Sequence, residues 1–111
     1  MPNVYVPQTP SRFDVATRVW VPTVSLSAAE KFGPIVQLLP PEAGRLATAP
    51  MVAALKERMA DFTEDDYLIA VGDPSVLAAA ACIAVRKTGG TLRLLKWDRY
   101  TSDYLPVELD I

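Results

Sequence analysis

Residues 67–71 form a continuous apolar run of strand length, and Gly72-Asp73-Pro74 follows directly. Apolar side chains at every position are typical of a strand that is covered on both faces, as in a parallel sheet. Asp73 and Pro74 are residue types preferred at the N-cap and the first position of a helix. The chain is therefore predicted to contain a central parallel strand that leads into a helix, which favours an α/β fold.

The rest of the chain supplies the other elements of such a fold. Strands are predicted over residues 4–6, 35–39, 91–97 and 104–111, because each is apolar or alternating and is bounded by turn residues. Ser27 and Glu30 have the spacing of a capping box and predict a two-turn helix that stops at Gly33-Pro34. Met51, Leu55, Met59 and Phe62 recur at helical spacing after Pro50, and an alanine-rich helix ends near Gly89-Gly90.

This order predicts a small three-layer α/β domain with a mostly parallel sheet and a Rossmann-like order of elements. The last strand contains Pro106, which cannot donate a ladder hydrogen bond, so a C-terminal antiparallel hairpin is expected at the sheet edge. The 111 residues fit one domain. Residues 7–26 are expected to be an irregular, proline-containing segment, in which residues 18–21 form a loop rather than a strand.

Composition restricts the chemistry. The chain has no histidine and one cysteine, which disfavours zinc sites and Ser-His or Cys-His catalysis. We therefore expect no cofactor, no metal and no catalytic residues, although catalysis of another kind stays open. The net charge of −2 disfavours nucleic acid as a partner. The longest apolar run, residues 76–85, is too short to span a membrane, and no targeting segment is visible, so a cytoplasmic location is expected.

Two kinds of binding site remain open. Ligands of parallel α/β sheets usually bind at the carboxyl ends of the strands. Arg45, Asp73, Ser75 and Arg99 would lie there and could bind an anion or a nucleotide at the start of the alanine-rich helix. Against this, the Asp73 carboxylate is an ideal cap, which would occupy the helix amides itself.

The second candidate is a surface for a protein partner on the predicted hairpin. Aromatic and basic side chains alternate there, and such side chains anchor many interfaces. The residues are Lys96, Trp97, Arg99, Tyr100 and Tyr104. The aromatic rings could instead pack against one another across the two strands.

The alanine-rich helix has almost no polar face, so we expect another element to cover it. The cover would be either the N-terminal segment with Phe13 and Trp20 or a second subunit. A homodimer is favoured, because two-fold assemblies are the commonest oligomers.

Several stretches of the chain resemble a group of small proteins of unknown function encoded by tailed bacteriophages. The stretches are Val4-Tyr5-Val6-Pro7-Gln8, Asp65-Asp66-Tyr67-Leu68, Gly72-Asp73-Pro74, Leu94-Leu95-Lys96-Trp97-Asp98-Arg99 and Tyr104-Leu105-Pro106-Val107. The resemblance implies an accessory phage protein made in the host cytoplasm. Together with the missing catalytic groups, it favours a protein that acts by binding a host or phage protein, and a small anion- or nucleotide-binding domain is the alternative.

Overall fold

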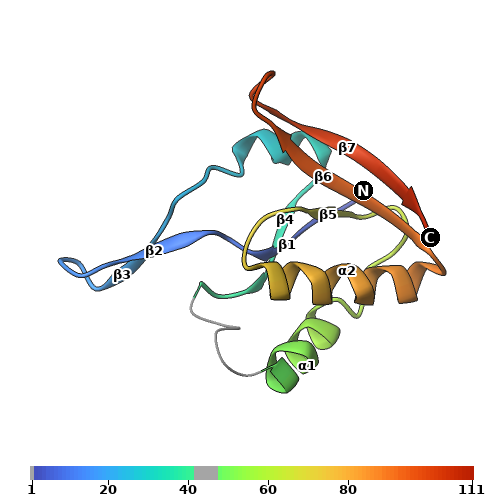
Figure 1. Ribbon diagram of the computed structural model, residues 1–111, viewed down its shortest axis with the longest axis horizontal. Coiled ribbons are helices and arrows are strands. Elements are labelled where there is room, and N and C mark those ends of the chain that lie inside the picture. The colour runs from blue at the N-terminus through green and yellow to red at the C-terminus, as the bar shows by residue number, and fades with distance from the viewer. Residues whose placement is uncertain (1, 42–47) are drawn as a thin grey trace.

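Five strands form the central sheet, in the order β4-β1-β5-β6-β7 (Figure 1). The computed structural model describes residues 2–41 and 48–111. Neighbours β4, β1, β5 and β6 pair in parallel, and β7 pairs antiparallel with β6 at the edge. The strands are β1 (Val4–Gln8), β4 (Ile35–Leu39), β5 (Tyr67–Ile69), β6 (Thr91–Asp98) and β7 (Asp103–Asp110). The predicted mostly parallel sheet and its edge hairpin are confirmed.

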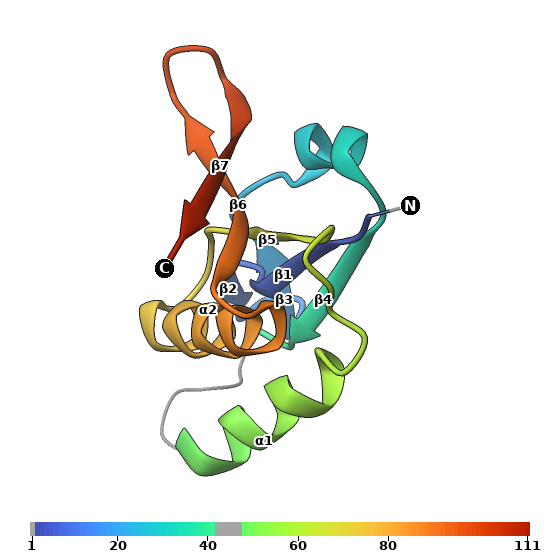
Figure 2. The same ribbon diagram turned by 90° about the vertical axis from the view of Figure 1, so that its right-hand side faces the viewer.

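The helices lie on both faces of this sheet (Figure 2). Helices α1 (Thr48–Arg58) and α2 (Pro74–Thr88) cover one face, and the 3-10 helix η1 (Ser27–Phe32) lies on the other. The connection from β1 to β4 moves along the sheet in the opposite direction from those that contain α1 and α2. Connections between parallel strands are almost always right-handed, so connections that run in opposite directions along the sheet lie on opposite faces. This explains the three layers.

The core is divided by the sheet into two clusters. On β1, Tyr5 points to the α1 and α2 face, whereas Val4 and Val6 point to the η1 face. The predicted apolar face of the first long helix is confirmed, because its four members are all buried: Met51, Leu55, Met59 and Phe62. The helix itself begins at Thr48 rather than Pro50 and ends before Met59.

Helix α2 begins and ends as the sequence predicts. The Asp73 carboxylate accepts hydrogen bonds from the backbone N–H groups of Ser75 (2.9 Å) and Val76 (3.3 Å). At the other end Gly89 adopts the left-handed conformation with φ 75°, and its N–H bonds to the carbonyl of Val85. An N-cap and a glycine stop thus define this helix, in which five of the fifteen residues are alanine.

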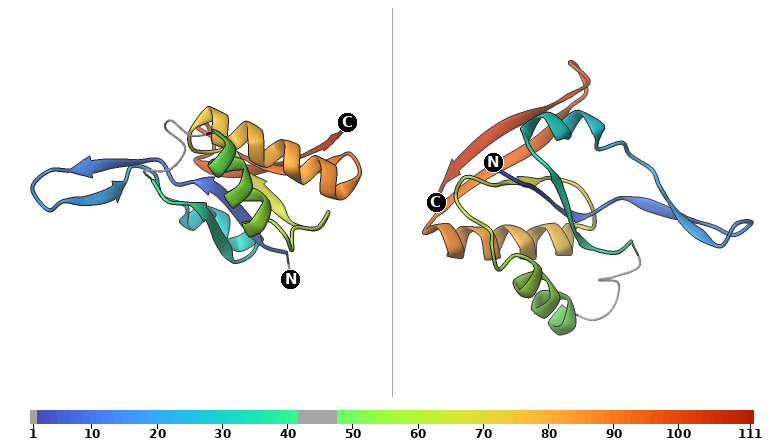
Figure 3. Two further views of the ribbon diagram at one scale, coloured as in Figure 1. Left: turned by 90° about the horizontal axis from the view of Figure 1, so that it is seen from below. Right: turned by 180° about the vertical axis from the view of Figure 1, so that it is seen from behind.

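Residues 7–26 are more regular than predicted. They contain a β-hairpin of two strands, β2 (Ser11–Asp14) and β3 (Val19–Pro22), which forms a separate sheet. Its turn is closed locally, because the Asp14 carboxylate accepts bonds from the Ala16 N–H and the Thr17 hydroxyl, both at 3.0 Å. We call this hairpin, residues 11–22, the β-arm. It projects from the rest of the molecule (Figures 1 and 3).

The predicted capping box before η1 is absent. Leu26 holds the N-cap position and makes no side-chain cap bond, while the Ser25 hydroxyl accepts the N–H of Ser27 at 3.3 Å. The helix is 3-10 rather than α because only six residues separate its start from the turn into β4, and short connections commonly use this tighter helix.

The alanine-rich helix is not covered by the N-terminal segment. Phe13 and Trp20 lie on the β-arm, which projects away from α2 (Figure 3). Helix α2 packs on the sheet and α1 through four buried residues: Val76, Ala80, Ile83 and Ala84. Cys82 lies in the apolar run of this helix and is exposed. In the parts of the chain that the structure describes, no helix is long and apolar enough to cross a membrane.

Candidate functional site

Trp97 and Tyr104 form an aromatic pair where β6 reaches its carboxyl end. They are directly opposed across the β6–β7 ladder, with ring centroids 5.0 Å apart and an interplanar angle of 70°. Tyr104 is 3% exposed, whereas Trp97 is 48% exposed. The cross-strand packing foreseen for these rings therefore exists, but one large ring still faces solvent.

The pair forms one wall of an apolar pocket of about 340 Å³. Val71, which follows β5, and Val24 and Ser25, which precede η1, line the rest. The Tyr104 hydroxyl donates to the Ser25 carbonyl at 3.3 Å and so joins the hairpin to this connection. Burial raises the pKa of Tyr104, so its hydroxyl is a neutral donor. We call this site the aromatic pocket.

The lining of the aromatic pocket suits binding better than catalysis. Its side chains are two valines, a serine, a tryptophan and a tyrosine. The tyrosine hydroxyl is already bonded, and no carboxylate, amine or thiol is among the described residues that line the pocket. An apolar cavity with few polar groups fits the apolar side chain of a partner.

The turn beside the pocket holds two carboxylates, Asp98 and Asp103, on either side of Arg99. The Asp98 carboxylate accepts bonds from the Tyr100 N–H (3.3 Å) and the Thr101 hydroxyl (2.8 Å). Asp103 pairs with Lys31 of η1, and this contact lowers the pKa of Asp103. Both carboxylates are thus engaged within the protein, while Arg99 in the same turn has no ion pair among the described residues.

The five predicted partner-binding residues all lie on the β6–β7 hairpin, but on more than one surface. Trp97 and Tyr104 face the η1 side and line the pocket. Lys96 pairs with Leu105 on the opposite face of the sheet, because successive side chains of a strand alternate. Arg99 and Tyr100 are in the turn, and Tyr100 is 93% exposed.

The described residues of the predicted anion site do not lie together in the structure. Arg45 lies outside the described residues. Asp73 caps α2, and Ser75 is exposed in the first turn of that helix. Arg99 is in the β6–β7 turn, which stands apart from the start of α2 in both views (Figures 1 and 2). Its described members are therefore spread over two regions.

The crevice at the carboxyl ends of β1 and β5 is filled by Gln8, a residue that sequence reasoning missed. The chain order of the strands reverses here, so a ligand site would be expected at this point of the sheet. Gln8 is 6% exposed, and its side chain bonds to the loops that follow β4 and β5. A glutamine at the end of a proline-containing strand carries no sequence signal that would predict this role.

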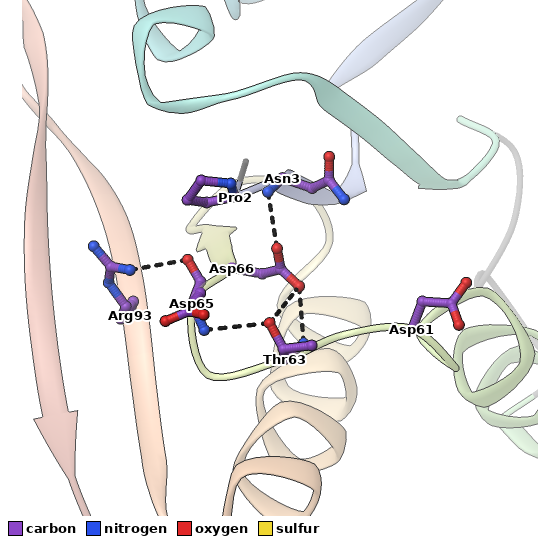
Figure 4. A pocket seen from close by; sticks show the side chains of 7 residues that line it. All are labelled: Pro2, Asn3, Asp61, Thr63, Asp65, Asp66 and Arg93. Atoms are coloured by element: carbon purple, nitrogen blue, oxygen red, sulfur yellow. Dashed lines mark hydrogen bonds between the residues drawn. The ribbon is translucent and has the colours of Figure 1, made fainter.

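A polar hollow of about 450 Å³ lies at the amino ends of the strands (Figure 4). At its centre Asp66 is 5% exposed and accepts bonds from the N–H groups of Asn3 and Thr63, both at 2.8 Å. Asp66 thus holds the start of β1 to the segment just before β5. No group of metal-binding side chains occurs among the residues described.

Arg93 forms the edge of this hollow (Figure 4). It donates to the Asp65 carbonyl at 2.9 Å and to the Tyr67 hydroxyl, and its guanidinium lies 4.2 Å from the centre of the Tyr67 ring. These contacts fix Arg93 in place, and among the described residues it forms no ion pair with the carboxylates around it.

Val24, Ser25 and Val71 complete the aromatic pocket but were not among the predicted site residues. Val71 ends the apolar run of the central strand, so its place at the carboxyl edge of the sheet was available from the sequence. The approach of residues 24 and 25 to the hairpin depends on the path of a long connection, which no local pattern indicates.

Comparison with known proteins gives one match. A family described as "Phage Pam3 gp32-like protein" matches residues 2–111. No curated protein and no solved structure matches the chain.

Proposed function

Because the chain belongs to the Phage Pam3 gp32-like protein family and is thus a bacteriophage protein, we propose that it acts by binding another protein through its aromatic pocket. The observation that carries this proposal is the half-exposed Trp97 over the buried Tyr104. A monomer gains little from exposing a large ring beside an apolar pocket, whereas tryptophan in such a setting is a common interface anchor.

The chemistry of the pocket specifies the partner's contact segment. An apolar side chain such as leucine fits a cavity of about 340 Å³ lined by valines and aromatic rings. A carboxylate next to it would pair with Arg99, which has no ion pair among the described residues. We therefore propose a host or phage protein that presents an apolar residue beside acidic ones. Phage proteins are made in the host cytoplasm, and we place the encounter there.

The anion- or nucleotide-binding alternative lacks comparable support. Asp73 already occupies the amides at the start of α2. A carboxylate at that position also repels phosphate.

A labelled peptide tests the proposed function. The probe is Ser-Gly-Leu-Glu-Glu-Gly with blocked ends, and its affinity is measured by fluorescence anisotropy. We expect weak, saturable binding that falls on the order of tenfold or more with Trp97→Ala. It should also weaken with Arg99→Glu but not with Lys87→Glu, a matched reversal of an exposed cation on α2.

Two further peptides separate the contribution of the leucine from that of the glutamates. Replacing the leucine of the probe by alanine should abolish binding, and replacing both glutamates by lysine should weaken it. Equal binding of all three peptides, or binding that Trp97→Ala leaves unchanged, would show that the aromatic pocket is not the docking site.

A further inference from the structure

We propose that the β-arm is a self-association element, which binds the acidic amino-end surface of a second copy of this chain. The proposal concerns a different surface from the aromatic pocket and does not depend on it. It rests on the exposure of the β-arm, on its charges and on the strand polarity of the fold.

The β-arm makes few contacts with the rest of its own chain. Its two strands pair with each other, and no other helix or strand packs extensively against them. Phe13 and Trp20 stack across the ladder with centroids 5.5 Å apart, yet Phe13 is 46% and Val19 52% exposed. A two-stranded hairpin in water is marginally stable at best, so a covering partner is expected.

The β-arm has a net positive charge, and its two arginines can bind a partner. Arg12 and Arg18 are exposed and have no ion pair among the described residues. Asp14, the one acidic residue of the β-arm, already accepts bonds from Ala16 and Thr17. The β-arm thus has a net charge of +1, and the rest of a chain of net charge −2 carries −3. A complementary surface must be acidic.

This chain has such a surface at the amino ends of its strands. Two hollows of about 450 and 350 Å³ adjoin there and share Asp65 and Arg93. Exposed carboxylates without an ion pair among the described residues surround them: Asp61, Glu64, Asp65 and Glu108. With Asp66, five carboxylates of the described part of the chain line the two hollows against one cation, Arg93, so the surface is net negative and suits cationic side chains.

Strand polarity excludes a contact between the β-arm and the acidic surface of the same chain. Asn3, just before β1, lines the acidic hollow, whereas the β-arm follows the carboxyl end of β1 at Gln8. The two surfaces therefore lie at opposite ends of the same strand, and the β-arm cannot fold back into its own hollow (Figure 1). In a two-fold dimer each β-arm would meet the other subunit, and the contact would be made twice.

Reciprocal charge reversal tests this contact. One variant carries Arg12→Glu and Arg18→Glu, and the other carries Glu64→Lys and Glu108→Lys; all four positions are exposed. Light scattering after size exclusion at low salt measures the mass of each and of their equimolar mixture. The wild type should be dimeric, each variant alone should be monomeric, and the mixture should dimerise, because both contacts regain opposite charges.

Matched controls exclude a general effect of charge. Arg86→Glu with Lys87→Glu, and Glu30→Lys with Glu57→Lys, change exposed residues elsewhere and should leave the dimer intact. Circular dichroism checks that each variant is folded. We expect the dimer dissociation constant of either reversed variant to rise on the order of 100-fold.

Several results would overturn the proposal. They are a wild type that stays monomeric as its concentration rises, reversed variants that still dimerise, and a mixture that fails to restore the dimer. A monomer whose β-arm instead binds duplex DNA with steep salt dependence would assign the β-arm to nucleic acid.

Discussion

The side-chain oxygen of Gln8 accepts a hydrogen bond from the backbone N–H of Asp73 at 3.3 Å, which connects the end of β1 to the start of α2. The amide nitrogen of the same side chain donates to the carbonyls of Pro40 (3.1 Å) and Pro41 (3.0 Å). One glutamine therefore joins three segments at the crevice where parallel α/β sheets usually bind ligands. In this protein the crevice has a structural role, and the binding surfaces we propose lie elsewhere.

Replacing Gln8 by alanine should destabilise the fold. The change removes three hydrogen bonds from a nearly buried side chain, each worth about 1 kcal/mol, so the free energy of unfolding should fall by about 2–3 kcal/mol. Urea denaturation measures the difference. Gln37→Ala is the control: its side chain is exposed and accepts one bond from Thr9, so a loss below about 0.5 kcal/mol is expected. Equal losses would contradict the structural role of Gln8.

Two glycines should respond differently to alanine. Gly72 has φ 101°, and an added Cβ would lie 2.4 Å from the Gln8 carbonyl oxygen, so Gly72→Ala should cost about 2–3 kcal/mol. Gly89 has φ 75° with open space around it, and Gly89→Ala should cost about 1 kcal/mol. Thermal unfolding ranks the two variants. The opposite ranking would show that β1 and the β5–α2 loop are not in close contact.

Stability should decrease at alkaline pH. Burial raises the pKa of Tyr104 and, together with the nearby Asp66 carboxylate, that of Tyr5. A raised pKa means that the folded state favours the neutral phenol. This contribution is complete below the ordinary tyrosine pKa of about 10 and is lost as the pH rises through the raised value.

Urea denaturation between about pH 9 and pH 11.5 measures this loss. Tyr104→Phe should reduce the pH dependence of the unfolding free energy by up to about 1.4 kcal/mol per pH unit. Tyr100→Phe changes a ring that is 93% exposed and should not reduce it. An unchanged slope in Tyr104→Phe would contradict the burial of that hydroxyl.

Cys82 should react readily in the native protein. Its side chain is exposed on α2, and it is the one cysteine of the chain. One equivalent of a thiol reagent such as dithionitrobenzoate should react without denaturant, at a rate within about tenfold of the unfolded chain. Because the proposed dimer uses the β-arm, the reaction should proceed equally in dimers. If Cys82 reacted only in denaturant, its side chain would be covered in the native protein, which would contradict its exposure on α2.

Much of the fold could be predicted because its signals are local. The apolar run at 67–71, the Asp73-Pro74 cap and the turn at Gly89-Gly90 each describe their own element. Pro106 marked an edge correctly. The Leu95 carbonyl accepts a hydrogen bond from the Ala70 N–H, so the backbone of Leu95 points away from β7. Pro106 pairs with Leu95, and its backbone therefore points away from β6, toward the open edge of the sheet. The N–H that proline lacks would make no hydrogen bond within the sheet at this position.

The β-arm was not predicted, because the prolines of this segment are evidence against regular strands. Pro7 lies inside β1, where it is tolerated because the β1–β5 ladder already ends at Tyr5 and Leu68. Pro22 pairs with Ser11 at the open end of the arm. The Asp14 carboxylate accepts bonds from Ala16 and Thr17 and so closes the turn of the β-arm, a local contact that composition does not reveal.

The candidate site could be predicted in part. Trp97, Arg99 and Tyr104 were recognisable as an aromatic and basic hairpin, but the alternation of β6 separates Lys96 from them. Exposure of the β7 side chains also differs from simple alternation, because Tyr104 is buried while Leu105 and Leu109 are 39% and 38% exposed. The pocket itself needs Val24, Ser25 and Val71 from distant segments, which only the folded chain brings together.

The most direct test of binding at the aromatic pocket compares the two tryptophans of the chain by NMR. Trp97 lines the pocket and Trp20 lies on the β-arm, so their indole N–H signals report on separate surfaces. Titration with the leucine-and-glutamate peptide should shift the Trp97 signal saturably and leave the Trp20 signal in place. A peptide that shifts Trp20 alone, or neither signal at millimolar concentration, would contradict the proposed function.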